Sequence, residues 1–178
     1  MRSIMYSAAF LGTVISLAQA EESEAEKKAI AKIRESGALV LEIAQNDNRL
    51  DVSYITAQGK VTNEQLAPIK DLTRLAQLNL RGLEIGDEAL VYLAGQKSLV
   101  RLHLEKTKIS DKGLEHLKGL ENLEYLNLYG TEIGDAGLEH LITLKKLKSL
   151  YLWQTKVTDE GVKKLQAALP ELKIIRGT

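Results

Sequence analysis

The stretch LVRLHLEKTKISDKGLEHLKGLEN, residues 99–122, is followed by LEYLNLYGTEIGDAGLEHLITLKK, residues 123–146, and together they decide the fold. When the two are aligned, leucine matches leucine at a spacing of 24 residues, so that Leu102, Leu126 and Leu150 form one column. A fixed period of this size predicts a solenoid, in which each unit stacks on the next.

Each unit combines two hydrophobic patterns. In Leu102-His103-Leu104 the alternation of apolar and polar residues predicts a strand whose leucines point inward. Farther along, Leu114 and Leu117 begin a stripe with leucine at every third residue, which predicts a helix facing the same interior. At ~2 kcal/mol for each buried leucine, one unit gains too little to order itself, so stability must arise between neighbours. The predicted class is α/β, a right-handed β-α superhelix with a curved parallel sheet on the concave face and helices on the convex face.

Five such units are expected between residues 50 and 178, which form the predicted repeat domain. The expected strand cores are Val52–Thr56, Gln77–Arg81, Arg101–Glu105, Tyr125–Tyr129 and Ser149–Trp153. The expected helices are Asn63–Lys70, Asp87–Gly95, Asp111–Leu120, Asp135–Leu144 and Asp159–Leu169. The closing segment LPELKII, residues 169–175, predicts a terminal strand. Because an unpaired first repeat would expose its core, the amphipathic helix and hairpin expected within residues 21–56 are interpreted as a cap, with 21–49 preceding the repeats.

Residues 1–20 have the pattern of a secretory signal peptide. Arg2 supplies the positive start, Ile4–Leu17 is mostly apolar or small, and Ala18-Gln19-Ala20 fits an A-x-A cleavage site. The alternative is that the segment stays uncleaved as an N-terminal anchor. The sequence therefore predicts an exported protein, periplasmic or secreted.

Composition excludes several functions. The chain has 24 basic and 24 acidic residues, so its near-neutral charge gives no reason to expect nucleic acid as a partner. It contains no cysteine, which excludes disulfides, cysteine-ligated zinc and a thiol nucleophile. No cofactor is predicted, and the chain is expected to be a monomer.

Polar residues in the turns recur with the repeat. Aspartates stand at or beside each predicted helix start, where they are expected to cap the helix rather than to bind metal: Asp87, Asp111, Asp135 and Asp159. Threonines recur just after the strands and are expected to satisfy a buried backbone group in the next unit: Thr107, Thr131 and Thr155.

The pattern LxxLxLxxTxIxDxGLxxLxxL, present in Leu99–Leu120 and Leu123–Leu144, resembles that of leucine-rich repeat proteins. It is similar to the secreted bacterial kind with threonine before the turn. It also resembles the cysteine-containing repeats of eukaryotic F-box proteins, which implies a ubiquitin-ligase adaptor as a remote alternative, although this chain has no F-box segment. The resemblance implies that the concave face is the contact surface, while the fold itself hosts unrelated roles.

Outward strand residues on that face fall into three predicted columns. The first holds Ser53, Gln77, Arg101, Tyr125 and Ser149; the second Ile55, Asn79, His103, Asn127 and Tyr151; the third Ala57, Arg81, Glu105, Tyr129 and Trp153. Strands lie ~4.8 Å apart, so the aromatic residues of two neighbouring strands should form one patch. Tyrosine and tryptophan concentrate at recognition hot spots. The predicted partner is a protein or peptide, bound by Tyr125, Tyr129, Tyr151, Trp153, Arg101, His103, Arg81 and Glu105.

Other ligand classes stay open. Aromatic rings can also hold sugars, and lysines near the C-terminus could bind anionic envelope polymers in a scaffold role: Lys145, Lys146, Lys148, Lys163, Lys164 and Lys173. Catalysis is not expected, because His103 and Ser149 stand two strands apart, beyond hydrogen-bond reach. His116 and His140 occupy equivalent outward positions in successive helices, which repeat duplication explains better than a metal site.

Overall fold

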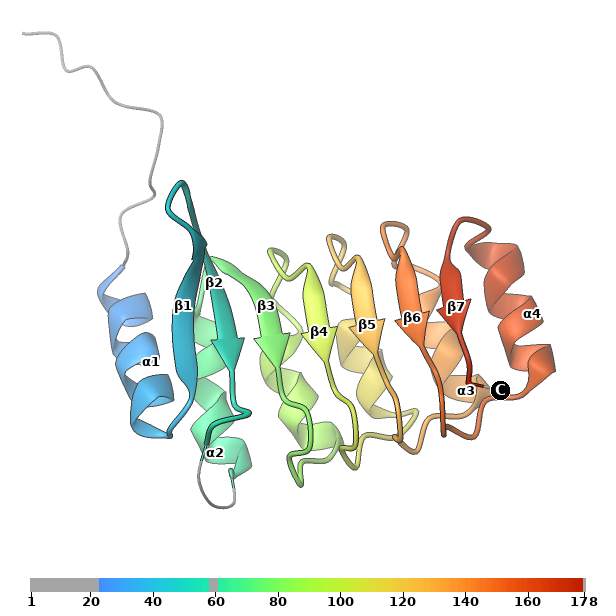
Figure 1. The fold of residues 1–178 in the computed structure, drawn as a ribbon, viewed down its shortest axis with the longest axis horizontal. Helices are drawn as coiled ribbons and strands as arrows, with labels where there is room; N and C mark the ends of the chain where they lie inside the picture. Colours follow the sequence, from blue (N-terminus) through green and yellow to red (C-terminus); the bar gives the residue numbers. More distant parts are fainter. Residues whose placement is uncertain (1–22, 58–60, 178) are drawn as a thin grey trace, which may run out of the picture.

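The computed structural model describes residues 23–57 and 61–177, and the predicted signal peptide at 1–20 lies outside them. One open sheet runs through the described part in the order β1 to β7, with the helices on one side of it (Figure 1). Its strands are β1 (Leu39–Ala44), β2 (Asp47–Ser53), β3 (Leu75–Asn79), β4 (Arg101–His103), β5 (Tyr125–Asn127), β6 (Ser149–Tyr151) and β7 (Lys173–Ile175). The β1–β2 pair is antiparallel and every later pair is parallel, which confirms the predicted α/β solenoid.

The strands β4 to β6 are shorter than the five residues predicted, yet the pairing of backbones continues past them. Leu104 N–H donates to Asn127 O at 3.0 Å, and Lys106 N–H donates to Tyr129 O at 2.8 Å. The sheet therefore keeps its order for a further row of side chains beyond the formal strand ends.

The helices of the convex side are shorter than predicted, and several of them are 3₁₀ rather than α-helix. Its elements are α2 (Asn63–Leu66), η1 (Ala67–Asp71), η2 (Asp87–Leu93), η3 (Gly113–Leu117), α3 (Asp135–Leu138), η4 (Glu139–Leu141) and α4 (Asp159–Ala168). A 3₁₀ helix has three residues per turn and rises ~2.0 Å per residue, so it aligns leucines spaced by three. Leu114, Leu117 and Leu120 have that spacing and are fully buried. Among the repeats within residues 23–57 and 61–177, only the last, which precedes the C-terminal strand, has a convex α-helix of more than two turns.

The N-terminal helix α1 (Glu24–Glu35) closes the first end of the core, as predicted for a cap. Its Glu26 is 1% exposed and accepts hydrogen bonds from the Thr73 N–H at 2.8 Å and from Arg74 Nε at 3.2 Å. Burial raises the pKa of Glu26, but these hydrogen bonds outweigh it and leave the pKa below its ordinary value. The carboxylate therefore joins the cap to the turn before β3.

Aspartates link neighbouring repeats instead of capping their own helices. Asp87 accepts the Ser110 N–H at 2.7 Å and the Ser110 hydroxyl at 2.6 Å, while η2 shows no side-chain cap. Asp135 accepts the same two groups of Thr158, at 2.8 and 2.6 Å. The expectation of simple helix caps is wrong, because the carboxylate lies within reach of the next turn.

Asp87, Asp111 and Asp135 thus form a series of repeat-to-repeat bonds, called here the aspartate ladder, in which Asp111 lacks one bond. Asp111 accepts the Gly134 N–H at 2.7 Å, and Gly134 has no hydroxyl to offer its second oxygen. A Cβ at Gly137 would lie 2.5 Å from Asp111 Oδ1, so glycine is needed where the aspartate of the preceding repeat packs. Gly113 has the same relation to Asp87.

The buried threonines act within their own repeat. Thr107 Oγ1 donates to Leu104 O, and Thr131 Oγ1 donates to Leu128 O, both at 2.7 Å. The expectation that these hydroxyls bond to the next unit is wrong. Each hydroxyl instead donates to the carbonyl three residues earlier and so closes the turn of its own repeat.

Candidate functional site on the concave face

The side chains on the open face of the sheet form three rows across the strands. The first contains Leu41, Asp51, Gln77, Arg101, Tyr125, Ser149 and Lys173; the second contains Leu39, Ser53, Asn79, His103, Asn127, Tyr151 and Ile175. The third follows the strand ends, with Arg81, Glu105, Tyr129 and Trp153. The predicted columns hold for the later repeats, but the first repeat is shifted by two residues. Asp51, not Ser53, pairs with Gln77, because the buried Tyr54 fills the place of the second leucine.

Four aromatic rings meet at the C-terminal half of this face. The ring centroids of Tyr125 and Tyr151 are 5.3 Å apart, and those of Tyr129 and Trp153 are also 5.3 Å apart, with planes 28° from parallel. His103 extends the first pair, because its ring centroid is 4.9 Å from that of Tyr125. The rings thus form two contacting groups on neighbouring strands of one face, which are called here the aromatic patch. Trp153 is 50% exposed and offers apolar area to solvent.

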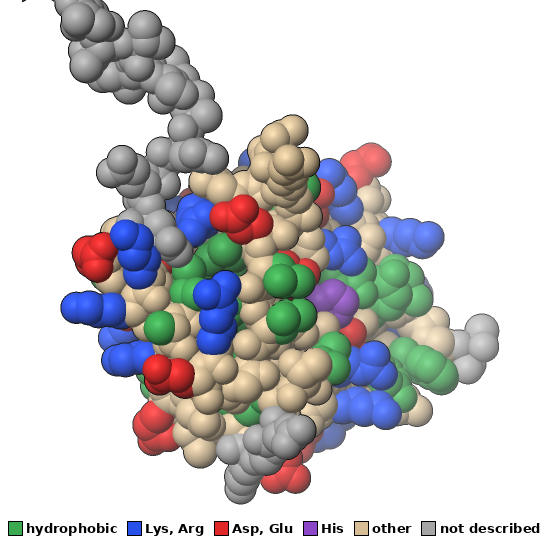
Figure 2. Space-filling view, turned by 60° about the vertical axis from the view of Figure 1, so that its left-hand side comes forward, with side chains coloured by type: hydrophobic (Ala, Val, Ile, Leu, Met, Phe, Trp, Pro, Cys, Tyr) green, Lys and Arg blue, Asp and Glu red, His purple; other side chains and the backbone are tan. Residues whose placement is uncertain are grey.

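Basic side chains border the aromatic patch. The guanidinium carbon of Arg101 lies 4.1 Å from the Tyr125 ring centroid, and Lys106 Nζ lies 5.7 Å from that of Tyr129. Both distances fall within the range of cation–π attraction. Arg81 is exposed on the neighbouring strand end. Figure 2 shows hydrophobic and basic side chains lying next to one another on the side of the molecule it presents.

Glu105 lies deeper than the sequence analysis expected. Its side chain is 8% exposed, and Oε1 accepts a bond from Asn127 Nδ2 at 2.7 Å and lies 2.9 Å from His103 Nδ1. The two neighbours lean over the carboxylate because all three residues belong to adjacent rows. Oε2 is buried without a hydrogen-bond partner among the described residues. Glu105 therefore forms the floor of the face and orients His103.

A groove of about 470 Å³ lies beside these rings. It is lined by Arg81, Glu105, Lys106, Asn127, Tyr129, Tyr151, Trp153, Ile175 and Gly177. Aromatic walls, two basic side chains at the rim and one buried carboxylate give the groove both apolar and polar recognition elements. Lys106 is a member that the sequence analysis missed, since it follows the third column by one residue.

A second apolar area marks the N-terminal end of the same face. Leu39, Leu41 and Ile55 are 47%, 51% and 57% exposed. Leu39 and Leu41 belong to the segment predicted as a cap, and no binding role was expected for them. Their position follows from the antiparallel register, which places Leu41 opposite Asp51.

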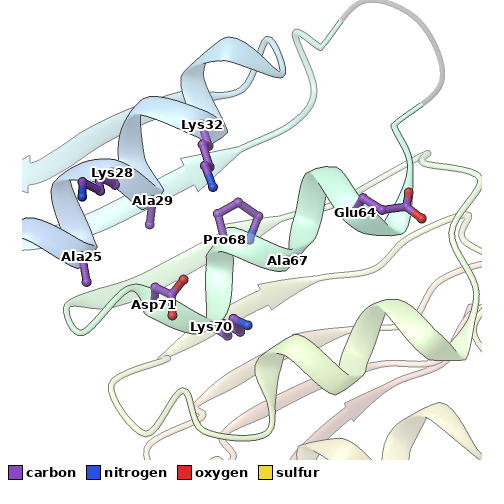
Figure 3. Close-up of a pocket in the computed structure, with 9 residues that line it drawn as sticks. All are labelled: Ala25, Lys28, Ala29, Lys32, Glu64, Ala67, Pro68, Lys70 and Asp71. Atoms are coloured by element: carbon purple, nitrogen blue, oxygen red, sulfur yellow. The ribbon is translucent and has the colours of Figure 1, made fainter.

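Two further hollows lie away from the sheet. One, between α1 and η1, is about 410 Å³ and is bordered by Lys28, Lys32 and Lys70 (Figure 3). Lysines around a shallow hollow of this kind are usual for a solvated surface. The other, about 480 Å³, lies between α3 and α4 beside Ile142 on the convex side. Within the described ranges, no three histidine or acidic side chains are placed to hold a metal ion.

Comparisons with known proteins agree with this architecture. A family model described as a leucine-rich repeat matches residues 95–118 and 119–141. No curated protein matches the chain in sequence. No helix in the part of the chain that the structure describes is long and apolar enough to cross a membrane.

Three solved structures are similar to this chain. An internalin C2 from Listeria monocytogenes is 28% identical, with a TM-score of 0.48 over 62% of this chain and 54% of its own, so that this chain spans about half its length. The leucine-rich repeat ectodomain of the receptor kinase SOBIR1 from Arabidopsis thaliana is 17% identical, with a TM-score of 0.54 over 86% of this chain and 92% of its own. The actin-binding site 2 of leiomodin-1 is 15% identical, with a TM-score of 0.53 over 84% and 89%.

The latter two likenesses show the fold across most of the chain. The leucine-rich repeat fold is typical of modules that bind other proteins through an extended concave surface, and such modules are generally not enzymes. The chain therefore carries leucine-rich repeats in residues 95–141, and its stacked parallel strands share the leucine-rich repeat fold of these structures.

Proposed function

We propose that this chain is an exported, non-enzymatic module that binds a protein or peptide through the aromatic patch of its concave face. The observation that supports it is the contact of Tyr125 with Tyr151 and of Tyr129 with Trp153 on neighbouring strands. Rigid amphipathic rings give large contact area at low entropic cost, which is why they dominate binding hot spots. Arg101 and His103 add polar groups at the edge of the same patch.

The test is capture of a binding partner by the mature chain and by its Trp153→Ala variant. Loss of a central aromatic anchor is expected to cost at least ~2 kcal/mol, which is about thirtyfold in affinity. Val91→Ala is the matched control, because Val91 is also 50% exposed but belongs to η2 on the convex side. Circular dichroism should show the same folded content in both variants. Equal capture by wild type and Trp153→Ala would refute the proposal.

A sugar is the second candidate ligand, favoured by the nearly parallel Tyr129 and Trp153 rings. Such rings can pack against the apolar face of a pyranose. A soluble-oligosaccharide array with wild type and Tyr129→Ala distinguishes the two: sugar binding that depends on Tyr129 favours a glycan, and its absence favours a polypeptide.

Export is proposed from the pattern of residues 1–20. Cell fractionation should place the chain outside the cytoplasm, and mass measurement should give a mature protein beginning at Glu21. An Ala20→Arg substitution is expected to retain the leader, since the cleavage site requires small residues. A full-length wild-type chain in the exported fraction would support the uncleaved anchor instead.

A further inference from the structure

We infer that the partner docks through a segment carrying a carboxylate, which Arg81 and Lys106 receive at the rim of the groove beside Trp153. The inference rests on the proposed function and specifies the chemistry of its partner. It follows from how the charges of the repeat surface are paired.

Away from the groove, three lysines each pair with a glutamate of the preceding repeat. The ion pairs are Lys108–Glu84, Lys148–Glu124 and Lys156–Glu132. Arg81 and Lys106 differ, because neither makes an ion pair or a side-chain hydrogen bond within residues 23–57 and 61–177. Two basic groups without a carboxylate partner among the described residues thus line one groove.

The backbone of Lys106 adds a second observation. Its φ is 56°, in the left-handed region, where side chains with a Cβ are strained. The equivalent positions 24 residues away on either side are Gly82 and Gly130, with φ of 75° and 67°. Glycine would therefore suit this turn better, and the lysine occupies it at a conformational cost. Gln154 shows that the turn accepts a second such residue next to Trp153.

The buried Glu105 sets how deep the incoming group reaches. Its Oε2 has no donor among the described residues, so a second carboxylate pressed against the floor would be repelled. At the rim, Arg81 and Lys106 outnumber that one negative charge. The partner's carboxylate is therefore held at the rim, with a neighbouring apolar side chain against Tyr129 and Trp153. Arginine can receive it with two parallel hydrogen bonds, and Lys106 with one.

The experiment selects linear random peptides from a display library on the mature chain and measures the affinity of synthetic copies. Enriched peptides should carry Asp or Glu next to an aromatic or aliphatic residue. Arg81→Gln and Lys106→Gly should each weaken binding about tenfold, the usual scale for a lost charge-assisted hydrogen bond. Lys106→Gly also relaxes the turn, so its loss of binding cannot come from unfolding. Lys163→Gln, on α4 of the convex side, is the matched charge control and should bind like wild type.

The outcomes separate this inference from the proposed function. Peptides that depend on Trp153 but not on Arg81 or Lys106, or that carry no acid, overturn the inference alone. Peptides whose binding is unchanged by Trp153→Ala, or no peptide binding at all, overturn both. Binding of acidic polysaccharide beads in place of peptides, abolished by the same two substitutions, overturns the polypeptide partner and assigns the rim charges to a polyanion.

Discussion

A single hydroxyl at position 134 should stabilise the protein by completing the aspartate ladder. Ser110 and Thr158 each give an N–H and a hydroxyl to the aspartate of the preceding repeat, whereas Gly134 gives only its N–H to Asp111. A Cβ at Gly134 would lie 3.5 Å from Asp111 Oδ2, an ordinary contact, and its φ of −119° suits any residue. Gly134→Ser is therefore expected to place a hydroxyl where the other two repeats have one.

The magnitude has two parts. Replacing glycine in a compatible conformation adds about 0.4 to 1 kcal/mol through the unfolded chain. The new hydrogen bond adds about 1 kcal/mol, less than the ~1.5 to 3 kcal/mol usual for a charged acceptor, because this rim is partly exposed to solvent. Together they should raise the melting temperature by about 3 to 8 °C for a chain of this size.

Urea and thermal unfolding followed by circular dichroism measure the effect. Gly134→Ala is the matched control, since it supplies the backbone part without the hydroxyl. The serine variant should exceed it by about 1 kcal/mol, and this difference should vanish in an Asp111→Ala background. Serine and alanine variants of equal stability would refute the proposed role of the ladder.

Three further predictions concern the same framework. Gly137→Ala should destabilise the fold by about 1 to 3 kcal/mol, because its Cβ would collide with the Asp111 carboxylate. Gly95→Ala is the control and should be tolerated, because a Cβ there would have nothing within 4 Å. The urea concentrations at the unfolding midpoints of the two variants measure the difference. Glu26→Ala should destabilise the fold by about 1 to 3 kcal/mol, because it removes the carboxylate that accepts hydrogen bonds from the Thr73 N–H and from Arg74 Nε, and hydrogen exchange should then quicken first in α1. Hydrogen bonds from Thr158 hold the pKa of Asp135 below its ordinary 3.8. The stability that the Asp135 carboxylate contributes is therefore present above pH 3.8 and is lost as the pH falls through its lowered pKa. In Asp135→Asn, the free energy of unfolding measured in urea should fall less steeply over this acid range.

Much of the fold was predictable because the period alone fixes it. Once Leu102 is aligned with Leu126, parallel pairing places each residue beside the one 24 positions later. The position of Tyr125 between Arg101 and Ser149 therefore follows directly from the repeat length. The first repeat was harder, because Val52 and Tyr54 replace the leucines that mark the register elsewhere. The strand of this repeat, β2, also pairs with the antiparallel strand β1, which has no repeat pattern in its sequence.

The details of the site depend on side-chain reach rather than on period. Alternation placed Glu105 outward, yet His103 and Asn127 lean over it and bury it. The sequence column also ended before Lys106, whose side chain returns over the Tyr129 ring from a left-handed turn. These contacts join side chains of different rows. The repeat pattern predicts the face of each residue separately, so it does not predict contacts between rows.

The aspartate ladder has a consequence for how such a chain can change in length. Each aspartate serves the turn of the following unit, and at the end Asp159 meets the side chain of Arg176 instead of another turn. A duplicated block of one whole period would bring both its donor and its acceptor, so every junction would be satisfied at once. A block of any other length would leave an aspartate without a donor on one side and a turn N–H without an acceptor on the other. The molecule is therefore extensible only in whole units, and its concave face can widen by one strand at a time without redesign of either end.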